Sequence, residues 1–142
     1  MRATLQNMTT KETHEKLDEF LAPTKIAIVA TINKEGMPHL TPNWYIYHKG
    51  KISISTTKER VKYKNLTHDN RMSICVLTEP LAKSYATIEG TVQIHDDDSI
   101  WETTEMIVKR YVEPEHVQPR MRELQKQNRV ILELNPDKVF FR

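Results

Sequence analysis

The strongest constraint on the fold of this chain is a succession of short β-rich segments that are joined by tight turns. The segment "KIAIVAT" at 25–31 is rich in β-branched residues and predicts a buried strand. The turn "NKEG" leads from it into "HLTPNWYIYH" at 39–48, and "HKG" leads on into "KISIST" at 51–56. Connections this short are typical of antiparallel hairpins and not of alternating strand–helix units.

Two residues predict irregularities in the strands. Pro42 has no N–H to donate to a strand ladder, so it indicates an edge strand or a bulge where the chain bends away. The segments "MSICVLT" at 72–78 and "SYATIEGTVQIH" at 84–95 predict two further strands, and Gly90 indicates a bulge in the second of them.

Helices are predicted around these strands by capping residues and by the spacing of apolar residues. In "TTKE", Glu12 follows Thr9 by three residues, which is the spacing of a capping box, and Pro23 ends that helix. Ser99 and Glu102 form a second capping box at the start of "SIWETTEMIVKRYV", whose apolar residues recur with the period of an amphipathic helix.

The rest of the chain completes a mainly β domain. "PEHVQPRMRELQKQ" predicts one more helix, and two strands, "RVILELNP" and "KVFF", are predicted to close the chain. We therefore expect a single domain built as an antiparallel barrel with flanking helices. Its expected parts are an N-terminal helix (1–21), a main barrel (25–95), a helical excursion (97–127) and closing strands (129–142).

Composition narrows the class of protein. With 142 residues, 38% hydrophobic and 28% charged, the chain has the composition of one globular domain. A net charge of +2 is too balanced to indicate nucleic-acid binding. The single cysteine, Cys75, excludes a disulfide within the chain and is expected to be a small buried apolar residue. With no signal-like segment and no membrane-length apolar run, we expect a cytoplasmic protein without membrane contact.

The sequence contains no familiar motif for a metal site or for a common class of catalysis. The six histidines are scattered without metal-ligand spacing, so no metal site is predicted. The chain carries no GxSxG, Walker or GxGxxG motif. The acidic run "HDDDS" at 95–99 is interpreted as a loop that caps the following helix.

The stretch "STTKERVKYKNL" at 55–66 is the first candidate for binding chemistry. Ser55, Thr56 and Thr57 end a predicted strand, and a short basic helix is predicted to follow at about 58–67. The free N–H groups at a helix start attract anions, and the hydroxyls add neutral donors. Arg60 can hold a phosphate through two bonds, while Lys62 acts as a point charge. The alternative is a solvated basic helix face.

The segment "TPNW" at 41–44 is the second candidate. A backbone interrupted by proline offers N–H and C=O groups to the polar edge of a planar heterocycle. Trp44 or Tyr45 could then cover the face of that ring. The alternative is that Trp44 belongs to the core.

Four segments together resemble a known family. "FLAPTKIAIVATINKEGMPHLTPNWYIY", "KISISTTKERVKYKNL", "RMSICV" and "SYATIEGTVQI" resemble, in their order and spacing, the pyridoxamine 5'-phosphate oxidase-like split-barrel flavoproteins. The chain is most similar to the short branch that uses the deazaflavin coenzyme F-420. The resemblance implies an FMN-binding type of split β-barrel and a homodimer with cofactor at its interface.

The resemblance also implies which residues meet the cofactor. The basic helix would hold phosphate, the turn after "PHLTP" would face the ring system, and the start of the "SYATIEG" strand would approach from the other side. The phosphate-binding residues would be Ser55, Thr56, Thr57, Arg60 and Lys62. The residues facing the ring would be Thr41, Pro42, Asn43 and Trp44, and those approaching from the other side would be Lys83, Ser84 and Tyr85. Some relatives have an aromatic residue where this chain has Lys83, so Lys83 could meet an anionic tail instead of stacking on a ring.

The resemblance implies an oxidoreductase in which the cofactor carries a hydride to or from a small conjugated substrate, and we assign no catalytic residue. Further cations at Lys58, Lys64 and Lys83 favour F-420, which has an anionic tail beyond its phosphate, over FMN. A barrel that sequesters a flavin or another planar anion without turnover is the alternative. The ending "KVFFR" carries no arginine-containing substrate segment, which argues against a true pyridoxamine phosphate oxidase.

Overall fold

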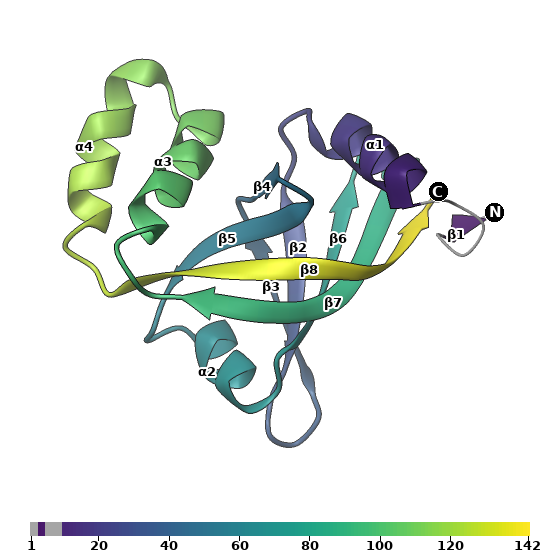
Figure 1. The fold of residues 1–142 in the computed structure, drawn as a ribbon, viewed down its shortest axis with the longest axis horizontal. Coiled ribbons are helices and arrows are strands. Elements are labelled where there is room, and N and C mark those ends of the chain that lie inside the picture. Colours follow the sequence, from purple (N-terminus) through teal and green to yellow (C-terminus); the bar gives the residue numbers. More distant parts are fainter. Residues whose placement is uncertain (1–2, 5–9) are drawn as a thin grey trace.

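The computed structural model describes residues 3–4 and 10–142, and Figure 1 shows how their helices and strands are arranged. In chain order these elements are β1 (Ala3–Thr4), α1 (Thr10–Leu21), β2 (Ala27–Ile32), β3 (Pro38–Asn43), β4 (Ile46–His48), β5 (Lys51–Thr57), α2 (Val61–His68), β6 (Arg71–Leu77), β7 (Tyr85–His95), α3 (Ile100–Tyr111), α4 (Pro114–Leu124) and β8 (Arg129–Phe141).

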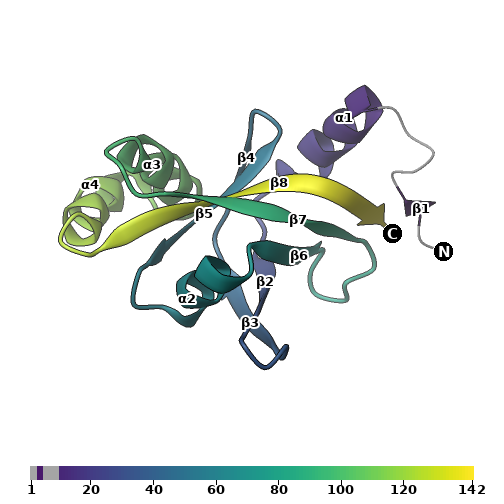
Figure 2. The ribbon, with the colours of Figure 1, turned by 60° about the horizontal axis from the view of Figure 1, so that its bottom comes forward.

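The strands form one antiparallel sheet that curls into a half-barrel. In the described part of the chain the strand order is β3-β2-β6-β7-β8-β5-β4, and β1 pairs with β8. Figure 2 shows that the long strands β7 and β8 run from the α3–α4 pair at one end to α1 at the other. The predicted split antiparallel barrel with flanking helices is confirmed.

The inner face of the curled sheet holds the main core. On β5 and β8 the paired residues Ile52 and Leu134, and Ile54 and Leu132, are fully buried, because alternate residues of a strand face the same side. Leu17 of α1 belongs to the same core cluster, so α1 closes one end of the half-barrel. This core supports the strands whose outer faces carry the candidate site.

The helices α3 and α4 pack on the outer face of the sheet. Ile107 of α3 shares a small cluster with Ile131 of β8. A second cluster joins α3 to α4 through Val108, Met121 and Leu124, and it is separate from the barrel core. The α3–α4 pair is therefore an added layer that rests on β8 and its neighbours.

Two expectations about the strands need correction. The closing segment is one continuous strand, β8, because an extra residue at Asp137 is absorbed as a bulge where Glu89 pairs with Lys138 and Gly90 with Pro136. The bulge expected in the strand at 84–95 therefore lies opposite Gly90, with its extra residue in β8 and not in β7. The strand expected at 39–48 is not broken at Pro42, which pairs with Ile28 inside the edge strand β3, but after Asn43. Its second part, β4, pairs with β5 at the other edge of the sheet.

The capping predictions have different outcomes. Thr9 lies outside the described residues. Ser99 makes no capping bond to α3; its N–H (2.9 Å) and its hydroxyl donate to the Asp97 carboxylate instead. These bonds lower the pKa of Asp97. No helix in the described ranges is long and apolar enough to cross a membrane.

Gly90→Ala should destabilise the fold. A Cβ at this position would lie 1.8 Å from the carbonyl oxygen of Asn135, so β7 and β8 would have to separate at the bulge. We expect a loss of about 1–3 kcal/mol in the free energy of unfolding, measured by urea denaturation. Thr91→Ala, at the exposed neighbour, is the control, and equal stability of the two variants would contradict the role given to Gly90.

Candidate functional site

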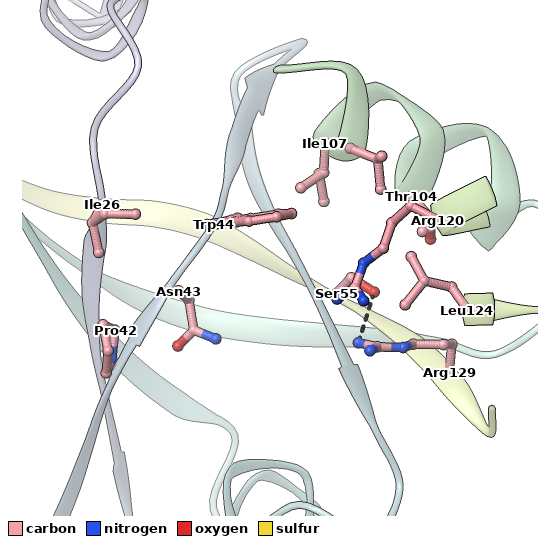
Figure 3. A pocket seen from close by; sticks show the side chains of 11 residues that line it. Ile26, Pro42, Asn43, Trp44, Ser55, Thr104, Ile107, Arg120, Leu124 and Arg129 are labelled. Atoms are coloured by element: carbon pink, nitrogen blue, oxygen red, sulfur yellow. Dashed lines mark hydrogen bonds between the residues drawn. The ribbon is translucent and has the colours of Figure 1, made fainter. Parts of the chain in front are cut away.

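A cavity of about 420 Å³ lies between the end of β3 and the α3–α4 pair (Figure 3). One side is formed by Pro42, Asn43 and Trp44. Ser55 and Arg129 also line the cavity, together with side chains from α3 and α4. The structure thus brings the "TPNW" segment and the end of β5 to one place, although Ser55 follows Asn43 by 12 positions in the sequence.

Trp44 forms an aromatic wall of this cavity. Its ring stacks on Tyr111 of α3 with centroids 4.9 Å apart and planes 4° from parallel. Because Tyr111 covers one face, only the other face and the edges of the indole remain accessible, and Trp44 is 37% exposed. Tyr45 is fully buried in the barrel core, so Trp44 is the aromatic residue of this pair that can meet a ligand.

The Trp44 platform is fixed by hydrogen bonds from α3 to the loop after α1. The Tyr111 hydroxyl donates to the carbonyl oxygen of Lys25 (2.6 Å). The guanidinium of Arg110 donates to the carbonyl oxygens of Leu21 (2.6 Å) and Ala22 (2.9 Å). These bonds satisfy carbonyls at the C-terminal end of α1 and hold α3 against it.

Asn43 offers a polar group beside the indole. The Thr41 hydroxyl donates to Asn43 Oδ1 over 2.9 Å, which orients the amide. Within the described ranges, no hydrogen bond engages the Asn43 NH₂ group, so it remains available as a donor. The polar edge of a heterocycle that stacks near Trp44 could accept this bond.

Arg120 and Arg129 line the other end of the cavity, whereas Arg60 and Lys62, near the start of α2, lie outside its lining. We call these four residues the cation cluster. Arg129 Nη1 donates to Ser55 Oγ at 3.5 Å. Burial, then the charges of Arg120 and Arg60, lower the pKa of Arg129. Burial, then the charges of Arg60 and Arg129, likewise lower the pKa of Lys62. Arg129 therefore interacts electrostatically with each of the other three cations.

Acidic side chains do little to neutralise the cation cluster. Across residues 3–4 and 10–142, no salt bridge involves Arg60, Lys62 or Arg129. Arg120 pairs with Glu123 at 3.4 Å on the exposed side of α4, where such a pair contributes little. Like charges that gather without counter-charges favour the binding of an anion.

Other predicted phosphate ligands are placed differently. Thr56 is 4% exposed and lies on the core face of β5 with Ile54, whereas Ser55 and Thr57 lie on the outer face. The sequence suggested a helix from about 58, but α2 begins at Val61, so Arg60 precedes its first turn.

Lys83, Ser84 and Tyr85 lie away from this cavity. They stand at the start of β7, where Tyr85 pairs with Arg142 at the end of β8 through backbone bonds of 2.9 and 3.1 Å. Figure 1 shows this end of β7 near α1, at the opposite end of the long strands from α3 and α4. A single chain does not bring these three residues to Trp44.

Tyr111, Arg120 and Arg129 were missed by the sequence analysis. Arg129 is the first residue of β8 and directly precedes an apolar run, and its position beside Thr57 follows only from the pairing of β5 with β8. Arg120 and Tyr111 lie on helices whose apolar spacing says which face is buried, but not which strand end that face approaches.

The comparisons agree with the fold. A family model described as pyridoxamine 5'-phosphate oxidase matches residues 13–142, so the chain belongs to that family. A conserved hypothetical protein from Mycobacterium tuberculosis is 22% identical, with a TM-score of 0.76 over 88% of this chain and 81% of that one.

Two further solved structures carry informative names. An F-420 reductase is 20% identical, with a TM-score of 0.70 over 86% of this chain and 94% of its own. A heme binding protein from Mycobacterium smegmatis is 19% identical, with a TM-score of 0.68 over 85% of this chain and 50% of its own. At these sequence identities, the structural similarity shows a shared fold and nothing more specific.

Lys62→Met should stabilise the ligand-free protein. Lys62 is 5% exposed and its pKa is lowered on folding, so its charged form disfavours the folded state at pH values below the folded pKa. That penalty decreases as the pH rises above the folded pKa and is gone only above the unfolded pKa. A neutral side chain of similar length removes it at any pH. We expect a gain of about 0.5–2 kcal/mol in urea unfolding at neutral pH.

The control for this substitution is Lys64→Met, which changes an exposed lysine on the same helix and should alter stability by less than about 0.5 kcal/mol. A loss of stability in Lys62→Met would mean that the buried ammonium is satisfied in the folded protein.

Proposed function

We propose that this protein is an oxidoreductase that transfers a hydride between a phosphate-bearing cofactor, coenzyme F-420 or FMN, and a small conjugated substrate. The observation that carries the proposal is a cavity with an aromatic and amide wall at one end and, at the other, Arg120 and Arg129 of the largely unneutralised cation cluster. A planar ring system that ends in phosphate has the matching chemistry. The F-420 reductase among the structural neighbours supports the choice of F-420.

The residues of this chain divide into two binding roles. Arg60 and Lys62 would hold the phosphate, with Ser55 and Thr57 as neutral donors beside it. The platform of Trp44 would orient the ring. When bound, the cofactor supplies the hydride chemistry, and the protein supplies binding and orientation.

We further propose that the working form is a homodimer. The outer face of β2 and β3 is apolar and partly uncovered: Leu40 is 63% exposed, and Pro38 and Ile32 line a hollow beside it. A second copy of the chain is the proposed occupant, because Lys83 and its neighbours lie far from the cavity of their own chain. In the dimer they would complete the cavity of the partner.

Binding without turnover is the second candidate function. One structural neighbour is named a heme binding protein. Heme is a planar molecule with anionic groups, so that name supports binding of a ligand of this kind. This alternative predicts stoichiometric ligand binding without reduction of oxidised acceptors, whereas an oxidoreductase reduces at least one conjugated acceptor with the reduced cofactor.

The cofactor assignment is tested by fluorescence titration with FMN and with F-420. We expect Arg60→Ala/Lys62→Ala to weaken binding by several kcal/mol, since a charge-assisted hydrogen bond contributes about 1.5–3 kcal/mol. Lys11→Ala, at an exposed lysine of α1 that has no assigned role in binding, is the control. Unchanged affinity in a folded double variant would show that the cluster does not hold the cofactor.

The dimer is tested by Leu40→Glu. A carboxylate buried in an apolar interface has no partner, so we expect a monomer in sedimentation velocity and at least tenfold weaker cofactor binding. Lys11→Glu on α1, also a change to glutamate, should leave the dimer intact. A Leu40→Glu protein that remains dimeric would exclude this face as the interface.

A further inference from the structure

We propose that the cavity selects ligands that carry a second anionic group beyond the first phosphate, and that Arg120 of α4 and Arg129 of β8 hold this second group. The inference deepens the proposed function and rests on it, because it assigns the tail of the same cofactor. It names residues on the helical excursion and on the closing strand as determinants of specificity.

The amount of positive charge is the first argument. A phosphate monoester carries a charge of about −1.5 to −2 at neutral pH. The cation cluster has four basic side chains, and within the described ranges three of them form no salt bridge. One phosphate therefore leaves positive charge uncompensated in a partly buried site, and a second anion would compensate the rest.

The order of the cations in space is the second argument. Arg129, at the start of β8, lines the cavity together with Arg120 of α4, and its charge also acts on Lys62 of α2. The cluster therefore runs from α2, past the start of β8, to α4. Figure 3 shows Arg120 and Arg129 extending from separate elements toward Ser55. An extended row of cations suits two linked anions better than one compact phosphate.

The contacts that Arg120 makes within the protein do not prevent it from binding a second anion. Its pairing with Glu123 is exposed, so an incoming anion can compete with that carboxylate. The packing of α4 depends on apolar residues, Val117 and Met121 among them, and not on Arg120. Lys58, a tail candidate on sequence grounds, is engaged with Asp96 at 3.4 Å instead.

The ligand class is a planar ring joined to two separate anions. F-420 has this chemistry through its phosphodiester and tail carboxylates, and FAD has it through a diphosphate, whereas FMN ends in one phosphate. These ligands share the second anion and differ in its source, so they separate a general polyanion site from a site for one tail.

The main experiment compares F-420, FAD and FMN by fluorescence titration with the wild-type protein and Arg120→Ala. We expect Arg120→Ala to weaken at least one ligand with a second anion by about tenfold, the effect of one charge-assisted contact, and to change FMN by less than about threefold. Arg122→Ala, an exposed arginine on the same helix that lines no part of the cavity, is the matched control. The ligand that loses affinity identifies the source of the second anion.

The proposal is overturned if Arg120→Ala weakens FMN as much as the longer ligands, or weakens none of them. A second measurement separates this failure from a failure of the proposed function. If the wild-type protein binds no flavin, the melting temperatures of the wild type and of Arg120→Ala are compared with inorganic pyrophosphate and with phosphate. Loss of the pyrophosphate effect alone in the variant supports the second anion site without any flavin; equal effects in both proteins overturn it.

Discussion

The pairing of β8 with β5 on one side and β7 on the other is the constraint on which the rest of the structure depends. Its register places Leu132 and Leu134 in the core and sets Arg129 opposite Thr57 on the outer face. A shift of one residue would exchange the two faces, burying charge and exposing leucines. The same register that forms the core therefore also positions a cation of the site, which ties the site to the stability of the barrel.

The cation cluster lowers the stability of the folded protein but favours the binding of an anion. Lys62 and Arg129 have lowered pKa values because burial and neighbouring cations disfavour their charged forms. The barrel core can offset this penalty, since its apolar residues are buried independently of the cluster. Sites that bind ions often carry such local instability, which the ligand then removes.

Much of the sheet could be predicted from local sequence, and the errors have local causes. Pro42 correctly indicated an edge strand, because it has no N–H to donate to a neighbouring strand. Gly90 lies opposite the bulge of β8, because a side chain there would meet the carbonyl of Asn135. The closing strand was divided in two because "NPDK" has the composition of a turn, whereas pairing with β7 keeps it extended through Asp137. Ser99 has the right spacing for a cap, yet its hydroxyl bonds to Asp97.

The sequence by itself determined the class of fold, the basic stretch after β5 and the family resemblance, because strand periodicity, turn residues and ordered motifs are local properties. Only the tertiary structure decided which residues share the cavity. Arg129 joins the site through strand register, and Arg120 and Tyr111 join it through the way in which α3 and α4 rest on the sheet. The physical reason is that contacts between elements far apart in the chain depend on packing and register, which no single segment specifies.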